Sequence, residues 1–158
     1  MKAEFEAFLT NRGLLPIDKW EKITVDHSKS TPDEAELKKF SKKNGIYVYL
    51  NQEKKCLYVG KGKPIYNRIR SHWKEAHADK FRSKAQDWFL FFGKHKESLD
   101  LYILPLDDEL DRQIVEKMLI RVLSPAFEEY RTDQKAIRKL ANKKLNATPV
   151  FRIDFPTR

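Results

Sequence analysis

A glutamate interrupts the apolar side of the amphipathic segment formed by residues 114–123. At 100° per residue, the aliphatic side chains of this segment occupy one broad arc of a helix, and Glu116 falls inside that arc. A carboxylate among apolar neighbours is unfavourable unless it is paired with a positive charge or binds a cation. Two interpretations are open: Glu116 forms an ion pair with a nearby lysine or arginine at the rim of the core, or it is a metal ligand.

Four other side chains with suitable chemistry come earlier in the chain, namely Tyr47, Tyr58, Arg68 and His72. Each has an ordinary structural explanation when taken singly. Tyrosines on a hairpin commonly pack against neighbours, and an arginine and a histidine four residues apart are typical of a solvated helix face. The loop Lys61-Gly62-Lys63 could offer ammonium and backbone N–H groups to a phosphate, although it lacks the spacing of a Walker loop.

The two tyrosines are expected on a β-hairpin. Residues 45–50 and 56–60 are rich in β-branched and aromatic side chains, and five polar residues separate them. Alternation places Ile46, Val48 and Leu50 on one face, and Tyr47 and Tyr49 on the other. In the second strand the same alternation groups Leu57 with Val59, opposite Cys56 and Tyr58. The aliphatic face is predicted to pack on a core, and the tyrosine face could line a groove.

The other residues are expected on helices and a further strand. Apolar residues at every fourth position (Ile65, Ile69, Trp73) predict a helix that begins at Pro64, with Arg68 and His72 on a neighbouring stripe. Residues 99–106 predict a strand. Residues 107–123 predict a helix whose first turn is acidic, as the helix dipole favours. Residues 80–98 fit either a buried strand or part of a helix.

Three segments follow from this pattern. Residues 1–43 are predicted to be a mainly helical N-terminal extension, with one helix that stops at Gly13 and another capped by Thr31. Residues 44–128 would form the core. Residues 129–158 are predicted to contain a basic helix, over 131–145, and a short strand, over 149–155. The fold class is α/β of the α+β type, a small antiparallel sheet flanked by helices.

The charge of the chain favours a polyanionic partner. Lysine and arginine number 32 against 23 acidic residues, a net charge of +9. The excess is segregated, because residues 129–158 hold eight basic and three acidic residues whereas 107–111 is acidic. Such a surface is expected to attract nucleic acid, although a lysine-rich soluble surface would explain the composition equally well.

These residues, in this order, resemble the GIY-YIG nuclease family. The first motif is Gly45-Ile46-Tyr47 and the second is Tyr58-Val59-Gly60, with valine for isoleucine. Arg68 stands at the family's arginine position, and His72 resembles the histidine found four residues later in several members. Glu116, in VEKMLIRVLSP, resembles the glutamate of the family's ExxLI…P segment. The chain departs from the family where an asparagine often follows that proline, because Pro125 is followed by Ala126, Phe127 and Glu128.

The resemblance implies a DNA endonuclease that hydrolyses phosphodiester bonds with one Mg²⁺ or Mn²⁺ ion held by Glu116. It implies Tyr47 as general base, with its pKa lowered by nearby positive charge, and Tyr58 as the group that orients water or phosphate. Arg68 would hold the phosphate, and His72 would bond to it or relay a proton. In addition, Lys61, Lys63 and Arg70 are predicted to contact nucleic acid.

A non-catalytic nucleic-acid-binding module that retains the fold is the alternative function. DNA is the expected partner in both cases, and no small-molecule organic cofactor is expected. No apolar run approaches the roughly 18 residues that cross a bilayer, and the first 13 residues do not resemble a signal peptide, so a cytoplasmic protein without membrane contact is predicted. A homodimer would let two single sites cut both strands of a duplex.

Overall fold

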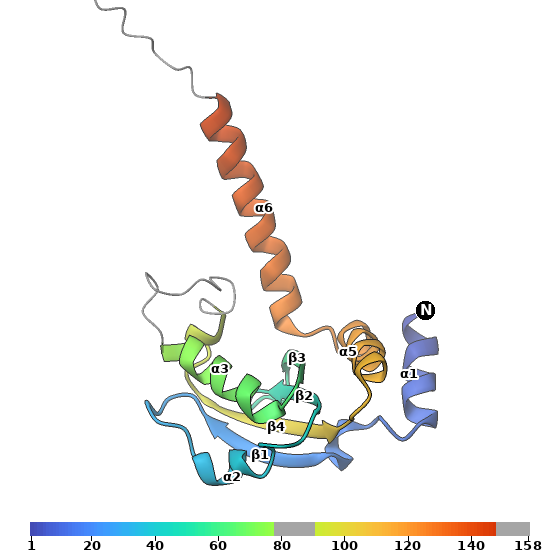
Figure 1. Cartoon of the computed structure of the whole chain (residues 1–158). Coiled ribbons are helices and arrows are strands. Elements are labelled where there is room, and N and C mark those ends of the chain that lie inside the picture. Colours follow the sequence, from blue (N-terminus) through green and yellow to red (C-terminus); the bar gives the residue numbers. More distant parts are fainter. Residues whose placement is uncertain (78–90, 148–158) are drawn as a thin grey trace, which may run out of the picture.

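A four-stranded antiparallel sheet forms the centre of the molecule. The computed structural model describes residues 1–77 and 91–147 (Figure 1). The strands are β1 (Glu21–Asp26), β2 (Gly45–Leu50), β3 (Cys56–Gly62) and β4 (Ser98–Pro105). Their order is β1-β4-β2-β3, and every neighbouring pair is antiparallel. The predicted hairpin, the predicted strand near residues 99–106 and the fold class are confirmed.

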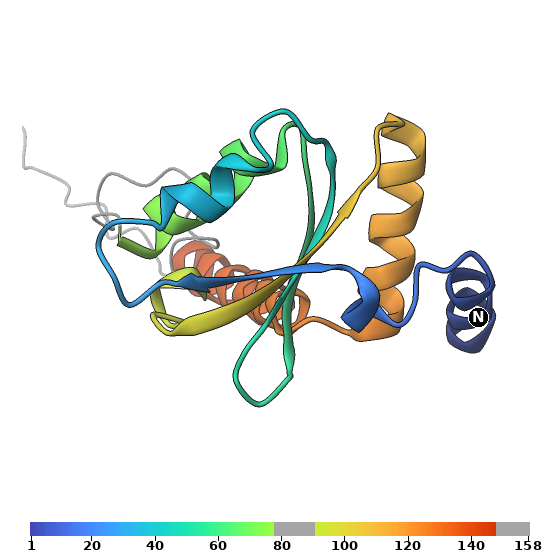
Figure 2. The same ribbon diagram turned by 90° about the horizontal axis from the view of Figure 1, so that it is seen from below.

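Helices lie on both sides of this sheet. Figure 2 shows the strands between α3 on one side and α5 on the other, with α1 beyond α5. The helical elements are α1 (Lys2–Asn11), the 3₁₀ turn η1 (Ile17–Lys19), α2 (Glu34–Lys38), α3 (Ile65–His77), α5 (Glu109–Leu123) and α6 (Ala126–Ala147). In α3 the predicted stripe of Ile65, Ile69 and Trp73 is buried, as expected for an amphipathic helix on a sheet.

Two hydrophobic clusters fill the spaces between sheet and helices. The α5 side is largely aliphatic and includes Ile46, Val48, Val59 and Leu119. The α3 side is largely aromatic and includes, among others, Tyr47, Tyr49, Tyr58, Trp73, Phe92 and Phe127. The prediction that the tyrosine face lines an open groove is wrong for Tyr47 and Tyr49, which are fully buried. Helix α3, the start of α6 and the residues before β4 cover that face.

A bulge in β3 changes which side chains share a face. Tyr49 is opposite Tyr58, whereas Leu50 is opposite Cys56, so Leu57 has no partner of its own. Leu57 packs in the aromatic cluster with Tyr58, and Val59 packs in the aliphatic cluster. The predicted grouping of Leu57 with Val59 is therefore wrong, because simple alternation fails at an extra residue.

The N-terminal segment contributes to the sheet. Strand β1 pairs with β4 from Glu21 to Asp26, so a boundary at residue 43 separates one strand from the sheet to which it belongs. The predicted stop of the first helix is close, since α1 ends at Asn11 and Gly13 has a positive φ of 71°. The second helix is capped by the side chain of Asp33 rather than by Thr31.

Caps define the ends of α5. The Asp108 side chain accepts a hydrogen bond from the backbone N–H of Asp111, which satisfies a free donor of the first turn. The buried guanidinium of Arg112 donates to the carbonyl of Leu106 and so holds the turn between β4 and α5. At the other end, Ser124 adopts the left-handed conformation and Pro125 separates α5 from α6.

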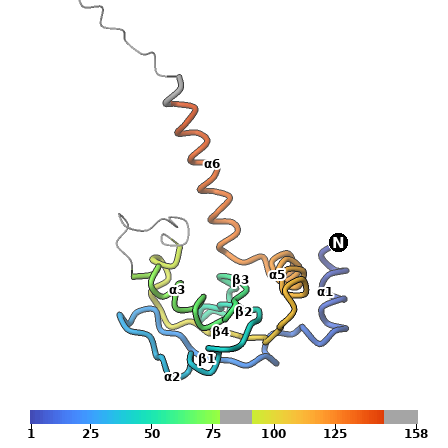
Figure 3. Tube along the Cα trace, viewed as in Figure 1, coloured from blue at the N-terminus to red at the C-terminus, as the bar shows by residue number. Residues whose placement is uncertain are grey.

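The C-terminal helix extends away from the rest of the molecule. Figures 1 and 3 show α6 leaving the body after its first turns. The predicted basic helix at residues 131–145 is confirmed and begins earlier, at Ala126. The predicted strand over 149–155 and most of the ambiguous segment 80–98 lie outside the described residues. In the part of the chain that the structure describes, no helix combines the length and apolarity needed to span a membrane.

Candidate active site

Tyr47 of β2 and His72 of α3 form a hydrogen-bonded pair between the sheet and the helix. The Tyr47 hydroxyl lies 2.8 Å from Nε2 of His72, and both side chains are buried. Burial lowers the pKa of His72 well below its ordinary value, and the nearby charge of Arg68 acts in the same direction. The imidazole is therefore neutral at pH 7, and its Nε2 accepts the phenolic proton when the ring proton is on Nδ1.

Burial also raises the pKa of Tyr47, well above the ordinary value for a phenol. Its tyrosine neighbours add to this effect, and Arg68 opposes it through its charge and a hydrogen bond. The expectation that nearby cations lower this pKa is therefore not met in the described state, because desolvation outweighs the guanidinium.

Arg68 joins the two motif tyrosines. Hydrogen bonds and charge from its half-buried guanidinium act on the hydroxyls of both Tyr47 and Tyr58. The pKa of Tyr58 is also raised, chiefly by burial, with Arg68 opposing the rise. A further hydrogen bond links Tyr58 to Tyr47. The hairpin and α3 thus bring together four of the five predicted catalytic side chains.

The glycine of the second motif leaves room for this arrangement. A Cβ atom on Gly60 would lie 2.5 Å from the Tyr47 hydroxyl and 2.5 Å from Cε1 of Tyr58. These separations are far below a normal carbon contact. Glycine is therefore required at position 60, because a larger side chain would occupy the space of the Tyr47 and Tyr58 rings.

Glu116 approaches Tyr58 from α5, which packs on the other face of the sheet. Its side chain is 18% exposed, and its carboxylate lies 3.5 Å from Nζ of Lys61. Burial raises the pKa of Glu116, whereas the charge of Lys61 lowers it. The ion-pair interpretation made from the sequence is therefore present in the structure.

The surroundings of Glu116 also fit a hard divalent cation. Glu116 and Tyr58 line an open pocket of about 370 Å³ together with Val59, Lys117, Ile120, Phe127, Glu128 and Arg131. Within residues 1–77 and 91–147, no group of three or more His, Cys, Asp or Glu side chains is placed to hold a metal ion. A cation here would have few protein ligands and several waters, as Mg²⁺ commonly does. Tyr47 does not line this pocket, but it is hydrogen-bonded to Tyr58, which does.

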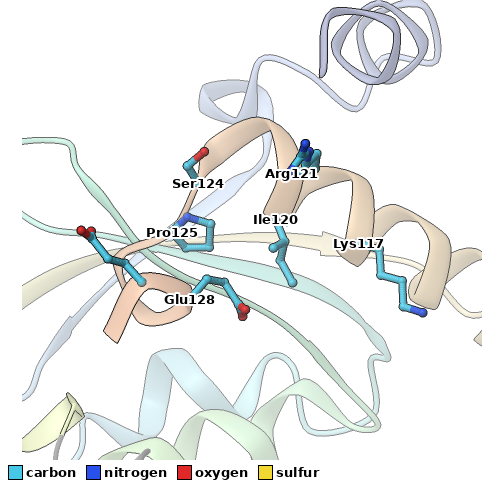
Figure 4. A pocket seen from close by; sticks show the side chains of 7 residues that line it. Lys117, Ile120, Arg121, Ser124, Pro125 and Glu128 are labelled. Carbon is cyan, nitrogen blue, oxygen red and sulfur yellow. The ribbon is translucent and has the colours of Figure 1, made fainter. Parts of the chain in front are cut away.

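Glu128 and Arg131 are site residues that the sequence did not reveal. Both line the Glu116 pocket, and their side chains form an ion pair of 2.7 Å. The charge of Glu128 contributes to the raised pKa of Glu116. Figure 4, which draws a neighbouring pocket that shares Lys117, Ile120 and Glu128, shows Glu128 shortly after Pro125, in the first turn of α6. Glu128 is one of the three residues after Pro125, the segment in which the family often has an asparagine.

The predicted nucleic-acid contacts are dispersed. Lys61 is close to the pocket, because its ammonium pairs with Glu116. Lys63 is exposed beside the start of α3. Arg70 points elsewhere, because its guanidinium pairs with Glu34 at 3.1 Å and lies over the ring of Tyr66. Arg70 is therefore not brought to the pocket, and its role in DNA binding stays a prediction.

Comparisons with known proteins find similar sequences. UvrABC system protein C from Campylobacter jejuni is 32% identical over 102 residues, which cover 65% of this chain and 17% of that protein. The corresponding protein from Salinibacter ruber is 28% identical over 108 residues, 68% of this chain and 16% of that protein. The chain thus spans about a sixth of the length of these relatives.

A solved structure is also similar. It is the GIY-YIG N-terminal endonuclease domain of UvrC from Thermotoga maritima, a point mutant bound to its catalytic divalent cation. The match has a TM-score of 0.43 and 21% identity, and it covers 61% of this chain and 97% of that chain. The model of the UvrC-like GIY-YIG domain matches residues 43–128, a range that is more than half of the chain and within which the five predicted catalytic residues lie. The chain therefore belongs to the family of UvrC-like GIY-YIG domains.

Proposed function

We propose that this protein is a DNA endonuclease that hydrolyses phosphodiester bonds at the Glu116 pocket. The observation that carries the proposal is the convergence, around β3, of one carboxylate, two phenols, a guanidinium and a neutral imidazole. Family membership and the net positive charge support a nucleic-acid substrate. A cytoplasmic location belongs to the same proposal.

Glu116 is the proposed metal ligand. A bound Mg²⁺ or Mn²⁺ would supply Lewis-acid stabilisation of the phosphoryl oxygens and of the leaving 3′-oxygen. Binding of a cation requires the Lys61 ammonium to move from its present position near Glu116. We expect the Lys61 ammonium then to contact a phosphate oxygen, which replaces its lost pairing with Glu116.

The tyrosines and His72 form the proposed route for the proton. Tyr58 reaches the pocket, orients the attacking water and passes a proton on to Tyr47. Tyr47, the general base, accepts that proton as its own phenolic proton moves to His72. This order follows the observed contacts from the pocket through Tyr58 to Tyr47 and His72. Because its raised pKa keeps Tyr47 protonated, Tyr47 can accept a proton only as its own proton leaves. The neutral His72 is in contact to receive that proton, at the energetic cost that the lowered pKa of His72 implies.

The first experiment is cleavage of supercoiled plasmid with Mg²⁺ or Mn²⁺. We expect nicking by the native protein that stops with EDTA and falls at least a hundredfold in Glu116→Gln. Glu53→Gln is the matched control, since Glu53 is an exposed carboxylate in the hairpin turn. Binding of Mn²⁺, measured by electron paramagnetic resonance, should weaken in Glu116→Gln and not in the control. Undiminished cleavage by Glu116→Gln would refute the metal assignment.

A non-catalytic nucleic-acid-binding module is the alternative. The full burial of Tyr47 and the pairing of Glu116 with Lys61 are the observations that favour it. The same experiment separates the two functions, because such a module would shift a duplex in a gel and leave plasmid intact with either metal ion.

A further inference from the structure

The outer part of α6 is a basic helix with little packing of its own. Its first turns are anchored by Phe127, in the aromatic cluster, and by Ala126 and Tyr130 packed against it. From Arg131 to Lys144 every side chain is exposed except that of Gln134, which is half-buried. Figures 1 and 3 show this part of the helix standing clear of the sheet. Solvated helices gain little stability by themselves, so a binding role is a reasonable explanation for the arm.

The positive charge on this arm is strongly unbalanced. Residues 131–144 contain six lysines and arginines and one acid, Asp133. A partner with dense negative charge is therefore favoured over a neutral or basic protein surface.

One face of the arm continues directly from the Glu116 pocket. Arg131 lines that pocket, and the positions 4, 7 and 11 residues further on share its face of the helix. They hold Lys135, Arg138 and Asn142. At 1.5 Å per residue this basic stripe (Arg131, Lys135, Arg138 and Asn142) is about 16 Å long. All four side chains can hydrogen-bond to phosphate oxygens.

We propose that the basic stripe of α6 binds the phosphate backbone of the DNA whose scissile phosphate occupies the Glu116 pocket. The inference rests on the proposed function, and it adds the direction in which the duplex leaves the site. The stripe would act on affinity and orientation without selecting a base sequence, because phosphate contacts carry no direct sequence information. Arg131 would exchange or share its pairing with Glu128 when the backbone arrives.

A second copy of the chain is the competing occupant of α6. Ile137 and Leu140 are 56% and 62% exposed, and they lie on a different face from the basic stripe. Two exposed aliphatic residues are a small area for a stable interface, whereas the charge asymmetry extends along the described arm. The measurement below therefore includes the oligomeric state.

A charge-transposed protein tests the stripe at constant composition. It carries Lys135→Ala with Ala136→Lys, and Arg138→Ala with Ala141→Arg, which places both charges roughly 90° or more from the centre of the stripe around the helix. Net charge and residue content are unchanged, so helix propensity is retained. Circular dichroism and thermal unfolding check that it folds, and the simple charge removal Lys135→Gln with Arg138→Gln is the second variant.

Binding is measured by fluorescence anisotropy on a duplex of about 20 base pairs without divalent metal, at several salt concentrations. We expect roughly tenfold weaker binding of the transposed protein near 0.1 M salt, and a slope of log affinity against log salt that is smaller by about 1.8 for two lost phosphate contacts. The loss should be similar for unrelated sequences. If the native and transposed proteins have equal affinity and equal salt slope, the proposal that the basic stripe binds DNA is wrong.

The outcomes separate this inference from the proposed function. If native protein cleaves plasmid and the transposed protein binds equally well, the nuclease stands and the stripe is wrong. If native protein neither binds nor cleaves DNA, both proposals fail. If sedimentation shows a dimer that Leu140→Lys disrupts, and the transposed protein binds DNA normally, α6 serves as a contact between copies of the chain.

Discussion

Both faces of the sheet are buried, and they differ in chemistry. On the α5 side, Ile46, Val48 and Val59 pack against Leu119, and the buried indole N–H of Trp20 is satisfied by the carbonyl of Leu14. On the α3 side, the tyrosines of the same two strands pack among aromatic rings that carry hydroxyl and imidazole groups. Side chains of β2 therefore alternate between an aliphatic face that stabilises the fold and an aromatic face that carries the candidate catalytic groups.

The aromatic face on the α3 side is less favourable for folding because it buries polar atoms. The Tyr47 hydroxyl has His72 as a partner. By contrast, the Tyr49 hydroxyl, the indole nitrogen of Trp73 and both ring nitrogens of His27 are buried without a hydrogen-bond partner among the described residues. Buried unpaired polar atoms are destabilising, so the aromatic face should contribute less to folding than its size suggests.

The largest expected change in folding stability comes from the aliphatic face. Leu119 is fully buried on α5, and Leu119→Ala should lower the free energy of unfolding by about 3 kcal/mol through lost burial and a residual cavity. Ile114 on the same helix is 42% exposed, so Ile114→Ala should cost less than about 1 kcal/mol. Urea denaturation measures both. Cleavage per folded molecule should remain at the native level, and a large loss of activity would show that the faces are not separable.

A smaller loss of folding stability is expected when the pH is lowered, because the aromatic face contains buried neutral histidines. Burial lowers the pKa of His27 to about 4, against an ordinary value of 6.5, and the pKa of His72 is lowered in the same direction. Between these values the unfolded chain binds more protons, so stability is complete above pH 6.5 and falls as the pH drops toward 4. His27 alone should remove about 2 kcal/mol between pH 7 and pH 5.

Denaturation of native protein and His27→Leu at both pH values checks this prediction. The variant should lose much of the pH dependence, since it has no imidazole to protonate at that position. A native protein equally stable at pH 7 and pH 5 would contradict the burial of neutral histidine.

The smallest change in stability, and the sharpest contrast, should come from the two hydroxyls of β2. Tyr47→Phe removes the bond to His72 and should cost about 1 kcal/mol, whereas Tyr49→Phe removes an unpartnered hydroxyl and should be neutral or stabilising. In plasmid cleavage, Tyr47→Phe should be at least a hundredfold slower and Tyr49→Phe near normal. Similar activities for the two variants would remove Tyr47 from the proposed proton route.

Much of the fold and of the site could be predicted because the relevant signals are local. Period-two alternation with a polar turn indicates a hairpin, and apolar residues at every fourth position indicate α3. Motif order then placed Tyr47, Tyr58, Arg68, His72 and Glu116 in one group, and the structure brings them together around β3. The bulge at Leu57 was missed, because one extra residue leaves no mark in a seven-residue strand.

The sequence by itself determined the hairpin, the helices α3 and α5, the basic character of α6 and the set of reactive side chains, since these depend on neighbours within a few positions. Only the tertiary structure decided that β1 joins the sheet, that the tyrosine face is covered, that Glu116 meets Lys61, and that Glu128 and Arg131 enter the pocket. Those features depend on the packing of segments far apart in the chain. The environment that raises the pKa of Tyr47 is therefore a property of the fold and not of the motif.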